Sequence, residues 1–392
     1  MPPQRRRFPL AVLALLALPA GAAPPVDPEG ALGRAAVAGF ARAEGTHAFA
    51  FPQDHGPHEP FRQEWWYFTG HLQAPGGERF GFEVTFFRFA LAPPGSTPAP
   101  VGASAWRTRE IYMAHFAVTD VAGRRFEFAQ KLSRAALDLA GATAPPLRVW
   151  VDDWALTAEA GEPLRWHVRA RQPRYALQLD LESQGAPVLN GTGGLSVKSA
   201  QAGAASWYYS LPRLTARGTL SRDGVPLEVA GTAWFDHEWG SSALSTRQSG
   251  WDWFAFQLDD GSTFMFYALR DRDGRRDPHS AGTFVDAAGA VRPLATDEVE
   301  LQPTGSWTSA DGVRYPAGWQ VRVPALALDL AARPVLADQE LRTRPRYWEG
   351  AVQVQGTRGG APAGGRGYVE LVGYAQERCP EAGTGAHRCV AR

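Results

Sequence analysis

Residues 64–72 decide the fold: they read Glu64-Trp65-Trp66-Tyr67-Phe68-Thr69-Gly70-His71-Leu72, a run in which aromatic residues predominate. A second such run, at 79–91, follows after a turn, and others lie at 111–119 and 165–170. Glycine, proline, asparagine and aspartate separate these runs, as is typical of short β-strands joined by turns. No convincing amphipathic helix of ordinary length interrupts them. The pattern predicts an all-β protein, either a sandwich or a barrel.

The chain also repeats its own pattern, and a length of 392 residues exceeds what a single core usually organises. The matching segments are 66–72 with 80–88 against 253–258 with 264–270, and 228–233 against 370–375. Two copies of one barrel, joined near residues 241–250, explain these parallels more simply than chance similarity among aromatic strands. We therefore predict an N-terminal domain at 45–240, a C-terminal domain at 241–378 and a tail at 379–392.

The first 23 residues predict an export signal. Arg5, Arg6 and Arg7 form a positive region, residues 8–18 are apolar, and Ala20-Gly21-Ala22 supplies small residues for cleavage. The apolar run is too short to span a bilayer, so no stable membrane span is expected after cleavage. Residues 24–44 are a lead-in segment whose main periodic feature is a short helix over 31–40. The predicted location is the periplasm or the exterior.

Charge and cysteine content exclude some partners. Lys and Arg total 40, which equals Asp and Glu. This neutrality argues against nucleic acid or an anionic membrane as the main partner. Cys379 and Cys389 could close a small loop in an oxidising compartment, and with His387 they are too few to hold a metal. Whether they are bonded, and the oligomeric state, stay open.

Several strings of the sequence resemble the AttH and carotenoid-hydratase-like family, also known for hydroxyneurosporene synthase. They follow the family's order over about residues 45–376, and are 64–72, 80–82, 85–88, 114–120, 231–241, 250–254 and 347–351. The resemblance implies two tandem lipocalin-like β-barrel domains. It also implies an apolar ligand, because one branch adds water to a terminal double bond of carotenoids, whereas other members are described only as predicted secreted hydrolases. The export signal and the string Asp236-His237-Glu238-Trp239-Gly240 depart from the carotenoid branch.

The string at 236–239 is the densest cluster of ionisable groups in an apolar strand context. Strand alternation predicts that Asp236 and Glu238 share one face with Trp234, while His237 and Trp239 share the other with Phe235. An acid held beside indole rings could stay protonated near neutral pH and protonate a double bond. We take His237 as the first catalytic candidate, Glu238 as the second and Asp236 as the third.

A structural alternative exists for the same string. Asp236 and Glu238 could pair with arginines such as Arg247 or Arg88 at the junction of the domains, with His237 as a hydrogen-bonding corner. Likewise, Glu83 and Arg88 could form an internal ion pair that helps to specify the fold and has no catalytic role.

The remaining ligand-binding candidates are Trp239, Trp66, Trp253, Glu64, Asp252 and His115. Each has a structural interpretation as well. Trp66 with Glu64 reads as a core tryptophan beside a rim carboxylate, and Asp252 lies opposite its neighbouring indoles and could face solvent. His115 reads as a satisfied core histidine, which burial would leave well placed to titrate near physiological pH.

Several catalytic motifs are missing from the sequence. There is no Gly-x-Ser-x-Gly elbow, no second histidine that would complete a zinc-protease motif after His237, and no phosphate-binding glycine loop. His55 and His58 lie in a Gly/Pro loop, where two histidines alone make a weak metal site. We therefore predict neither a cofactor nor a metal.

Three functions remain after these exclusions. The first is an enzyme, a hydratase, lyase or isomerase that acts on an isoprenoid or polyene. The second is a non-catalytic periplasmic carrier of an apolar lipid or pigment. The third is a secreted hydrolase of unknown substrate.

Overall fold

The computed structural model describes residues 38–96, 104–159, 164–241 and 244–375. Within these ranges strands account for 59% of the residues. The helices in the same ranges are three short 3₁₀ helices, at η1 (Gln53–His55), η2 (Thr296–Glu298) and η3 (Pro324–Leu326). The prediction of an all-β fold is confirmed. The expected signal segment, nearly all of the helix expected at 31–40, and both cysteines lie outside the described residues. Those ranges contain no helix with the length and apolar character needed to cross a membrane.

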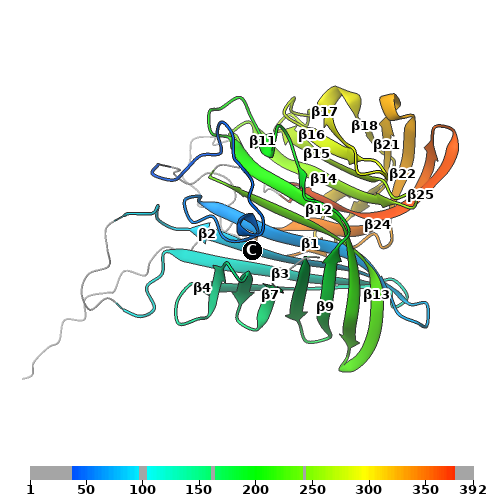
Figure 1. Cartoon of the computed structure of the whole chain (residues 1–392). Coiled ribbons are helices and arrows are strands. Elements are labelled where there is room, and N and C mark those ends of the chain that lie inside the picture. Colours follow the sequence, from blue (N-terminus) through cyan, green and yellow to red (C-terminus); the bar gives the residue numbers. More distant parts are fainter. Residues whose placement is uncertain (1–37, 97–103, 160–163, 242–243, 376–392) are drawn as a thin grey trace, which may run out of the picture.

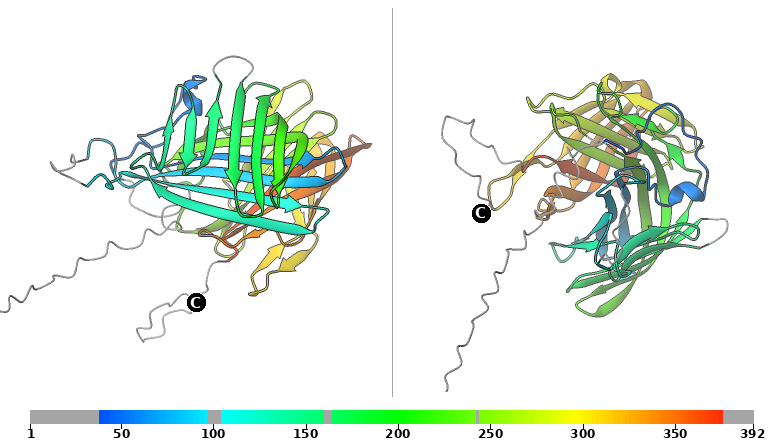
Figure 2. Two further views of the ribbon diagram at one scale, coloured as in Figure 1. Left: turned by 90° about the horizontal axis from the view of Figure 1, so that it is seen from below. Right: turned by 90° about the vertical axis from the view of Figure 1, so that its left-hand side faces the viewer.

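The first sheet has thirteen strands and curls into a nearly closed barrel (Figures 1 and 2). Its strands are β1 (Gln63–Gln73), β2 (Arg79–Ala90), β3 (Glu110–Asp120), β4 (Arg125–Arg134), β5 (Ala140–Thr143), β6 (Arg148–Val151), β7 (Trp154–Ala158), β8 (Arg165–Arg171), β9 (Tyr175–Ser183), β10 (Val188–Leu189), β11 (Leu195–Val197), β12 (Ala205–Arg222) and β13 (Val225–Gly240). The order is β4-β3-β2-β1-β13-β12-β9-β8-β7-β6-β5, and β10 and β11 pair with β12. The two ends of this order, β4 and β5, lie against each other.

The second sheet has ten strands and forms a half-barrel. Its strands are β14 (Gln248–Leu258), β15 (Thr263–Asp271), β16 (Ala281–Val285), β17 (Val291–Ala295), β18 (Glu300–Pro303), β21 (Trp319–Val323), β22 (Leu328–Pro334), β23 (Glu340–Leu341), β24 (Tyr347–Arg358) and β25 (Ala361–Val372). The order is β17-β16-β15-β14-β25-β24-β22-β21-β18, and β23 pairs with β24. A small separate hairpin joins β19 (Ser306–Thr308) to β20 (Arg314–Pro316). In both sheets the first strand lies between the second and the last, an order that supports the predicted duplication.

Strands β1 and β14 are buried on both faces, because each separates a barrel core from the space between the sheets. On β1, Trp66 and Phe68 enter the core of the first barrel, while Tyr67 joins the cluster between the sheets. On β14, Phe254 enters the second core and Trp253 the same intervening cluster. Strands that bury both faces read as continuous aromatic and apolar runs, which is why these two segments stand out in the sequence.

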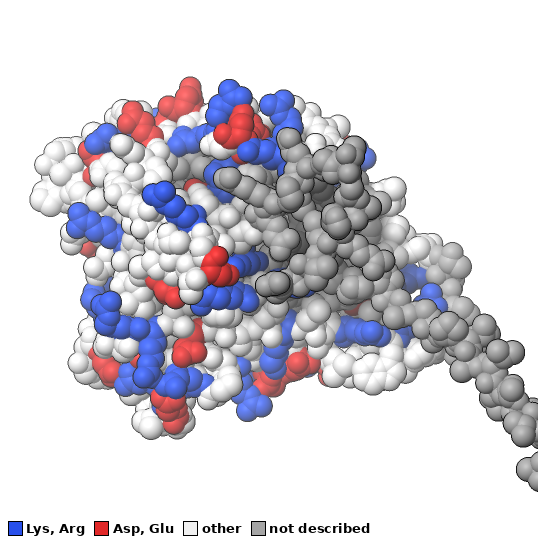
Figure 3. All heavy atoms as spheres, turned by 180° about the vertical axis from the view of Figure 1, so that it is seen from behind, with Lys and Arg blue, Asp and Glu red and all other residues white. Residues whose placement is uncertain are grey.

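The surface matches the neutral composition. The face in Figure 3 carries basic and acidic side chains interspersed over both sheets. Such mixing leaves the described part of this face without an extended region of one sign for a polyanion.

Candidate functional site

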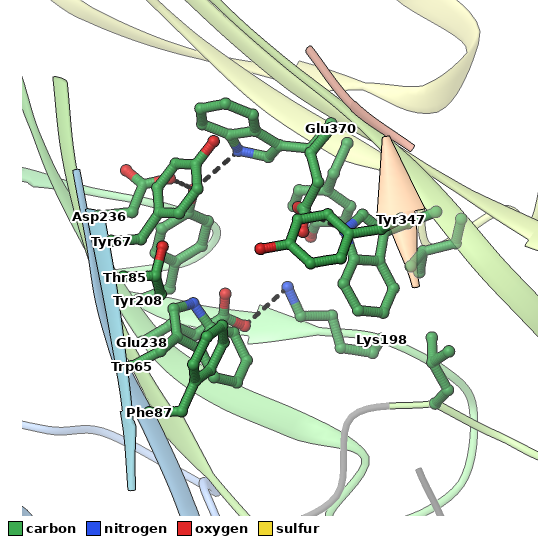
Figure 4. Close-up of a pocket in the computed structure, with 15 residues that line it drawn as sticks. Trp65, Tyr67, Thr85, Phe87, Lys198, Tyr208, Asp236, Glu238, Tyr347 and Glu370 are labelled. Carbon is green, nitrogen blue, oxygen red and sulfur yellow. Dashed lines mark hydrogen bonds and ion pairs between the residues drawn. The ribbon is translucent and has the colours of Figure 1, made fainter. Parts of the chain in front are cut away.

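A cavity lies between the two sheets, where strands of both present side chains to one another (Figure 4). It holds about 800 Å³ of empty space when the open solvent at its mouth is counted. Strands β1, β2, β12 and β13 supply one wall, β14, β15, β24 and β25 the other, and loops the rest. The lining residues are Trp65, Tyr67, Thr85, Phe87, Lys198, Tyr208, Asp236, Glu238, Leu244, Trp251, Trp253, Tyr267, Leu269, Tyr347 and Glu370.

Most of the cavity wall is aromatic. The ring of Trp253 meets the ring of Tyr67 edge to face, with centroids 5.2 Å apart. Its indole Nε1 donates a hydrogen bond of 3.2 Å to the hydroxyl of Tyr208. Because the wall offers large apolar surfaces and few polar atoms, it suits the apolar body of a ligand, which the polar atoms would orient.

Asp236 is held on the wall by three donors. Ser210 Oγ and Trp234 Nε1 each donate to Oδ1 at 2.6 Å, and the hydroxyl of Tyr208 donates to Oδ2. Burial disfavours the carboxylate and raises the pKa of Asp236 to about 7, although these hydrogen bonds lower it. Asp236 therefore carries a proton in part of the population near neutral pH, but both its oxygens are already engaged.

Glu370 faces the same cavity as Asp236, from the second sheet, and accepts fewer hydrogen bonds (Figure 4). Trp251 Nε1 donates to its Oε2 at 2.9 Å, and no hydrogen bond from a described residue reaches Oε1. Burial raises the pKa of Glu370 to about 7, and the nearby carboxyls of Asp236 and Glu238 act in the same direction. Glu370 thus carries a proton in part of the population near neutral pH, and its Oε1 accepts no hydrogen bond from a described residue.

The strand register shows how the two sheets correspond. Leu72, close to the end of β1, lies opposite Gly231 of β13. Leu258, at the end of β14, lies opposite Gly365 of β25. Leu72 is the last residue but one of β1 and Leu258 is the last residue of β14, so the two pairs are equivalent.

With these pairs aligned, Asp236 corresponds to Glu370. Asp236 lies opposite Tyr67, and Glu370 lies opposite Trp253, at the same place in each sheet. The sequence parallel that matched Glu228 with Glu370 is therefore wrong in register, because the strand pairing aligns Glu370 with Asp236. The two walls of the cavity carry equivalent acids that face each other.

Glu238 and Lys198 form an ion pair at another part of the wall (Figure 4). Lys198 Nζ lies 3.0 Å from Glu238 Oε1, and Ser206 also donates to this carboxylate. Burial lowers the pKa of Lys198, but Glu238, Tyr267 and Asp236 together raise it above its ordinary value, so the ammonium stays charged. It lies 4.1 Å from the ring centroid of Tyr267, where a cation–π contact stabilises the charge further.

Comparisons with known proteins agree with this architecture. A family model described as AttH-like matches residues 42–374. The chain belongs to the AttH-like family. A solved AttH structure from Nitrosomonas europaea is 37% identical, covers 86% of this chain and 100% of its own, and superposes with a TM-score of 0.75. Kievitone hydratase from Nectria haematococca is 17% identical, with coverage of 85% and 98% and a TM-score of 0.63. None of the curated proteins matches the chain.

These relatives confirm the predicted family and the fold of two lipocalin-like barrels. The likeness to the hydratase, at its low identity, concerns the fold alone. The string at 236–239 of this AttH-like protein is then divided between two compartments, as the alternation predicted. Asp236 and Glu238 line the cavity between the sheets, whereas His237 and Trp239 point into the first barrel.

The inward-facing candidates form a polar cluster of their own. His237 Nε2 lies 2.9 Å from Glu64 Oε1, and the indole of Trp66 stacks on the His237 ring with centroids 4.9 Å apart. Trp239 stacks on His58, with centroids 3.7 Å apart. The groups that could ligate a metal gather here, and they are His47, Asp54, His58, Glu64 and His237.

Asp252 and His115 lie apart from the ligand-facing surface. Asp252 accepts hydrogen bonds from Arg270 and Tyr374, on the face of β14 opposite Trp253. His115 is buried behind the cavity, with Nδ1 2.6 Å from the hydroxyl of Tyr347. Burial lowers the pKa of His115 to about 3, so the expectation that it titrates near physiological pH is wrong, because desolvation disfavours the imidazolium.

The ion pairs suggested by the sequence are also wrong. Arg88 and Glu83 are an odd number of residues apart on β2, so they point to opposite faces. Arg88 pairs with Glu64 and Glu110 inside the first barrel. The alternative that arginines neutralise Asp236 and Glu238 is likewise replaced by the hydrogen bonds and the lysine described above.

Sequence reasoning missed Glu370, Lys198 and the tyrosines of the cavity wall. Glu370 begins one of the compared strings, but that comparison matched it with Glu228 and gave no indication of its place in the cavity. Lys198 lies in a loop after β11, where a single lysine in a polar stretch has no distinguishing pattern.

Buried carboxyls behind the cavity make stability depend on pH. Burial raises the pKa of Glu83 to about 8 from an ordinary value of 4.5, and its partner is Thr85. The folded state therefore keeps a proton that the unfolded chain has lost, and this stabilisation disappears as the pH rises through about 8. Below pH 6.5 buried histidines such as His115 oppose this trend, since the unfolded chain protonates them first.

We therefore expect the free energy of unfolding to fall between pH 6.5 and 8.5. Urea titrations at several pH values should show this fall, to which Glu83 contributes on the order of 1–2 kcal/mol. The isosteric Glu83→Gln variant should have a shallower dependence. Equal slopes for both proteins would show that Glu83 is ionised in the folded state.

Proposed function

We propose that this AttH-like protein, after export, binds an apolar alkene in the cavity between its barrels and adds water across the double bond. The observation that carries the proposal is the pair of equivalent acids, Asp236 and Glu370, whose pKa burial raises to about 7 in an aromatic cavity. The fold shared with a protein named kievitone hydratase supports this class of chemistry. The export signal read from residues 1–23 supports the location.

The reaction needs a proton donor, a shielded cation and water. Glu370 donates its proton to one alkene carbon, the π electrons form the new C–H bond, and the other carbon becomes a carbocation. A water molecule bonds to that carbon through oxygen and returns one proton to Glu370. The net change is the addition of one water, with the acid regenerated.

The surrounding side chains can stabilise the carbocation and hold the water that this reaction needs. The indole faces of Trp251 and Trp253 can stabilise a developing cation, as ring faces attract positive charge. Asp236, pinned by its three donors, is a positioning residue for the hydroxyl of Tyr208. The ion pair of Glu238 and Lys198 provides a polar region where water is stabilised against the apolar wall.

The test uses the mature protein purified from the periplasm, with its N-terminus checked by mass spectrometry. Farnesol, an isoprenoid alcohol with several double bonds, serves as the probe. Quenching of tryptophan fluorescence should report binding, and incubation in H₂¹⁸O should yield a hydrated product that carries ¹⁸O. Binding without label would make the protein a carrier, and neither binding nor label would overturn the proposal for this class of ligand.

A further inference from the structure

The polar cluster inside the first barrel carries a second site, on the opposite face of β1 and β13 from the cavity. His58 precedes β1, Glu64 lies on β1 and His237 lies on β13. Glu64 Oε1 is 2.6 Å from His58 Nδ1 and 2.9 Å from His237 Nε2. We propose that these three atoms bind a divalent transition-metal ion of the zinc class.

The hydrogen bonds of His237 leave its Nε2 available to a metal. Its Nδ1 lies 3.0 Å from the backbone carbonyl oxygen of Asp54, a group that can only accept. Nδ1 therefore carries the proton, and in the neutral ring Nε2 presents a lone pair toward the carboxylate of Glu64. Two acceptors that face each other repel unless a cation lies between them. A histidine that donates one nitrogen to a backbone carbonyl is the usual arrangement of a metal ligand.

His58 is oriented in the same manner. Its Nε2 lies 3.1 Å from Asp54 Oδ1, so a proton there is donated to a carboxylate. Its Nδ1 lies 2.6 Å from Glu64 Oε1, and a metal ion bound there would replace the proton on this nitrogen. Asp54 thus orients both histidines, one through its side chain and the other through its carbonyl, and His47 supports Asp54 from outside at 3.1 Å. Carboxylate–histidine–metal arrangements fix the ligand ring in this way.

The two carboxylate oxygens of Glu64 have different partners: Oε2 accepts hydrogen bonds that hold the side chain, and Oε1 faces the proposed ion. The backbone N–H of His58 donates to its Oε2 at 2.9 Å, and Arg88 reaches the same oxygen at 3.4 Å. Oε1 contacts only the two histidines among the described residues. Its side chain is fully buried, so a charge at this position requires a close partner.

The carboxylates of the cluster exceed its arginine by two negative charges, which two positive charges would balance. Arg88 offsets one of the carboxylates of Glu64, Glu110 and Asp54, which leaves two negative charges in a largely buried group. Two protons, one on each of His58 and His237, or one divalent ion would balance them. The ion also removes the need for two imidazolium rings, whose centroids would lie 5.6 Å apart.

The donor set and spacing suit zinc. Two imidazoles and one carboxylate are a recognised zinc combination, which leaves a fourth tetrahedral position for water. Bonds of about 2.0–2.1 Å place tetrahedral ligand atoms about 3.3 Å apart, so the cluster must open by about 0.5 Å. The loop that carries His58 can supply this movement more easily than the paired strands.

The experiment measures metal alone, independently of any activity. Protein stripped with a chelator is titrated with Zn²⁺ by calorimetry, and with Co²⁺ while the visible absorption of a tetrahedral site is recorded. We expect one ion per chain. The His237→Gln and Glu64→Gln variants should bind it more than about 100-fold more weakly, which exceeds the usual loss from removing a second-shell partner.

Two further variants distinguish the site from general effects. His167→Gln removes an exposed histidine that also contacts two carboxylates, Glu159 and Asp180, and should leave affinity unchanged. Asp54→Asn keeps all three ligands and should weaken binding about 10- to 100-fold, while circular dichroism checks that each variant folds. Wild-type protein that binds no Zn²⁺, or binding that is equal in His237→Gln, would overturn the site.

Discussion

Replacing Glu370 with Gln is expected to lower the rate of farnesol hydration by about 10²- to 10⁴-fold, the range for loss of a general acid. The amide keeps the shape of the side chain and its contact with Trp251 but cannot donate a proton of comparable acidity. Farnesol affinity, measured by tryptophan fluorescence, should change little because the apolar wall is intact. Initial rates from ¹⁸O incorporation provide the measurement.

The pH profile gives this prediction a second readout. Because the acid must be protonated and the pKa of Glu370 lies at about 7, the wild-type rate should fall as the pH rises through 7. The residual rate of Glu370→Gln should lack that fall. Glu228→Gln, which changes an exposed carboxyl on β13, is the matched control and should behave as wild type. A variant that keeps both the rate and the alkaline fall would exclude Glu370 as the acid.

The alternation of side chains along strands was the most informative feature of the sequence. It separated Asp236 and Glu238 from His237 and Trp239 correctly, because side chains of a regular strand alternate between its two faces and the pairing of β13 with β1 has no bulge over these residues. The aromatic runs likewise indicated the strands and the duplication. Such local rules need no knowledge of neighbouring strands.

Strand alternation alone could not show which residues come together in each site. Glu64 and His237 are far apart in the chain, and only the pairing of β1 with β13 brings them together. Glu370 reaches the cavity because the second sheet packs against the first, and its equivalence to Asp236 depends on register. A one-residue slip in register exchanges the two faces of a strand, so neither compartment could be assembled from the sequence.

Arg88→Met is expected to lower the free energy of unfolding by about 3–5 kcal/mol, the cost of removing one partner from a buried ion pair. The side chain of Arg88 is 1% exposed. Its Nε lies 2.7 Å from Glu110 Oε1, and Nη1 lies 3.4 Å from Glu64 Oε2. Methionine preserves much of the volume but leaves Glu64 buried without its guanidinium.

Arg88 also ties the segment before β1 to the barrel, which makes the expected loss larger than that of a simple pair. Its guanidinium donates to the backbone carbonyls of His58, Glu59 and Phe61. Urea unfolding followed by circular dichroism measures the loss. Arg165→Met, at an exposed pair with Glu182, is the control and should cost less than about 1 kcal/mol. If both variants unfold alike, Arg88 is not what holds this segment, and His58, the proposed ligand on it, is held by its other contacts.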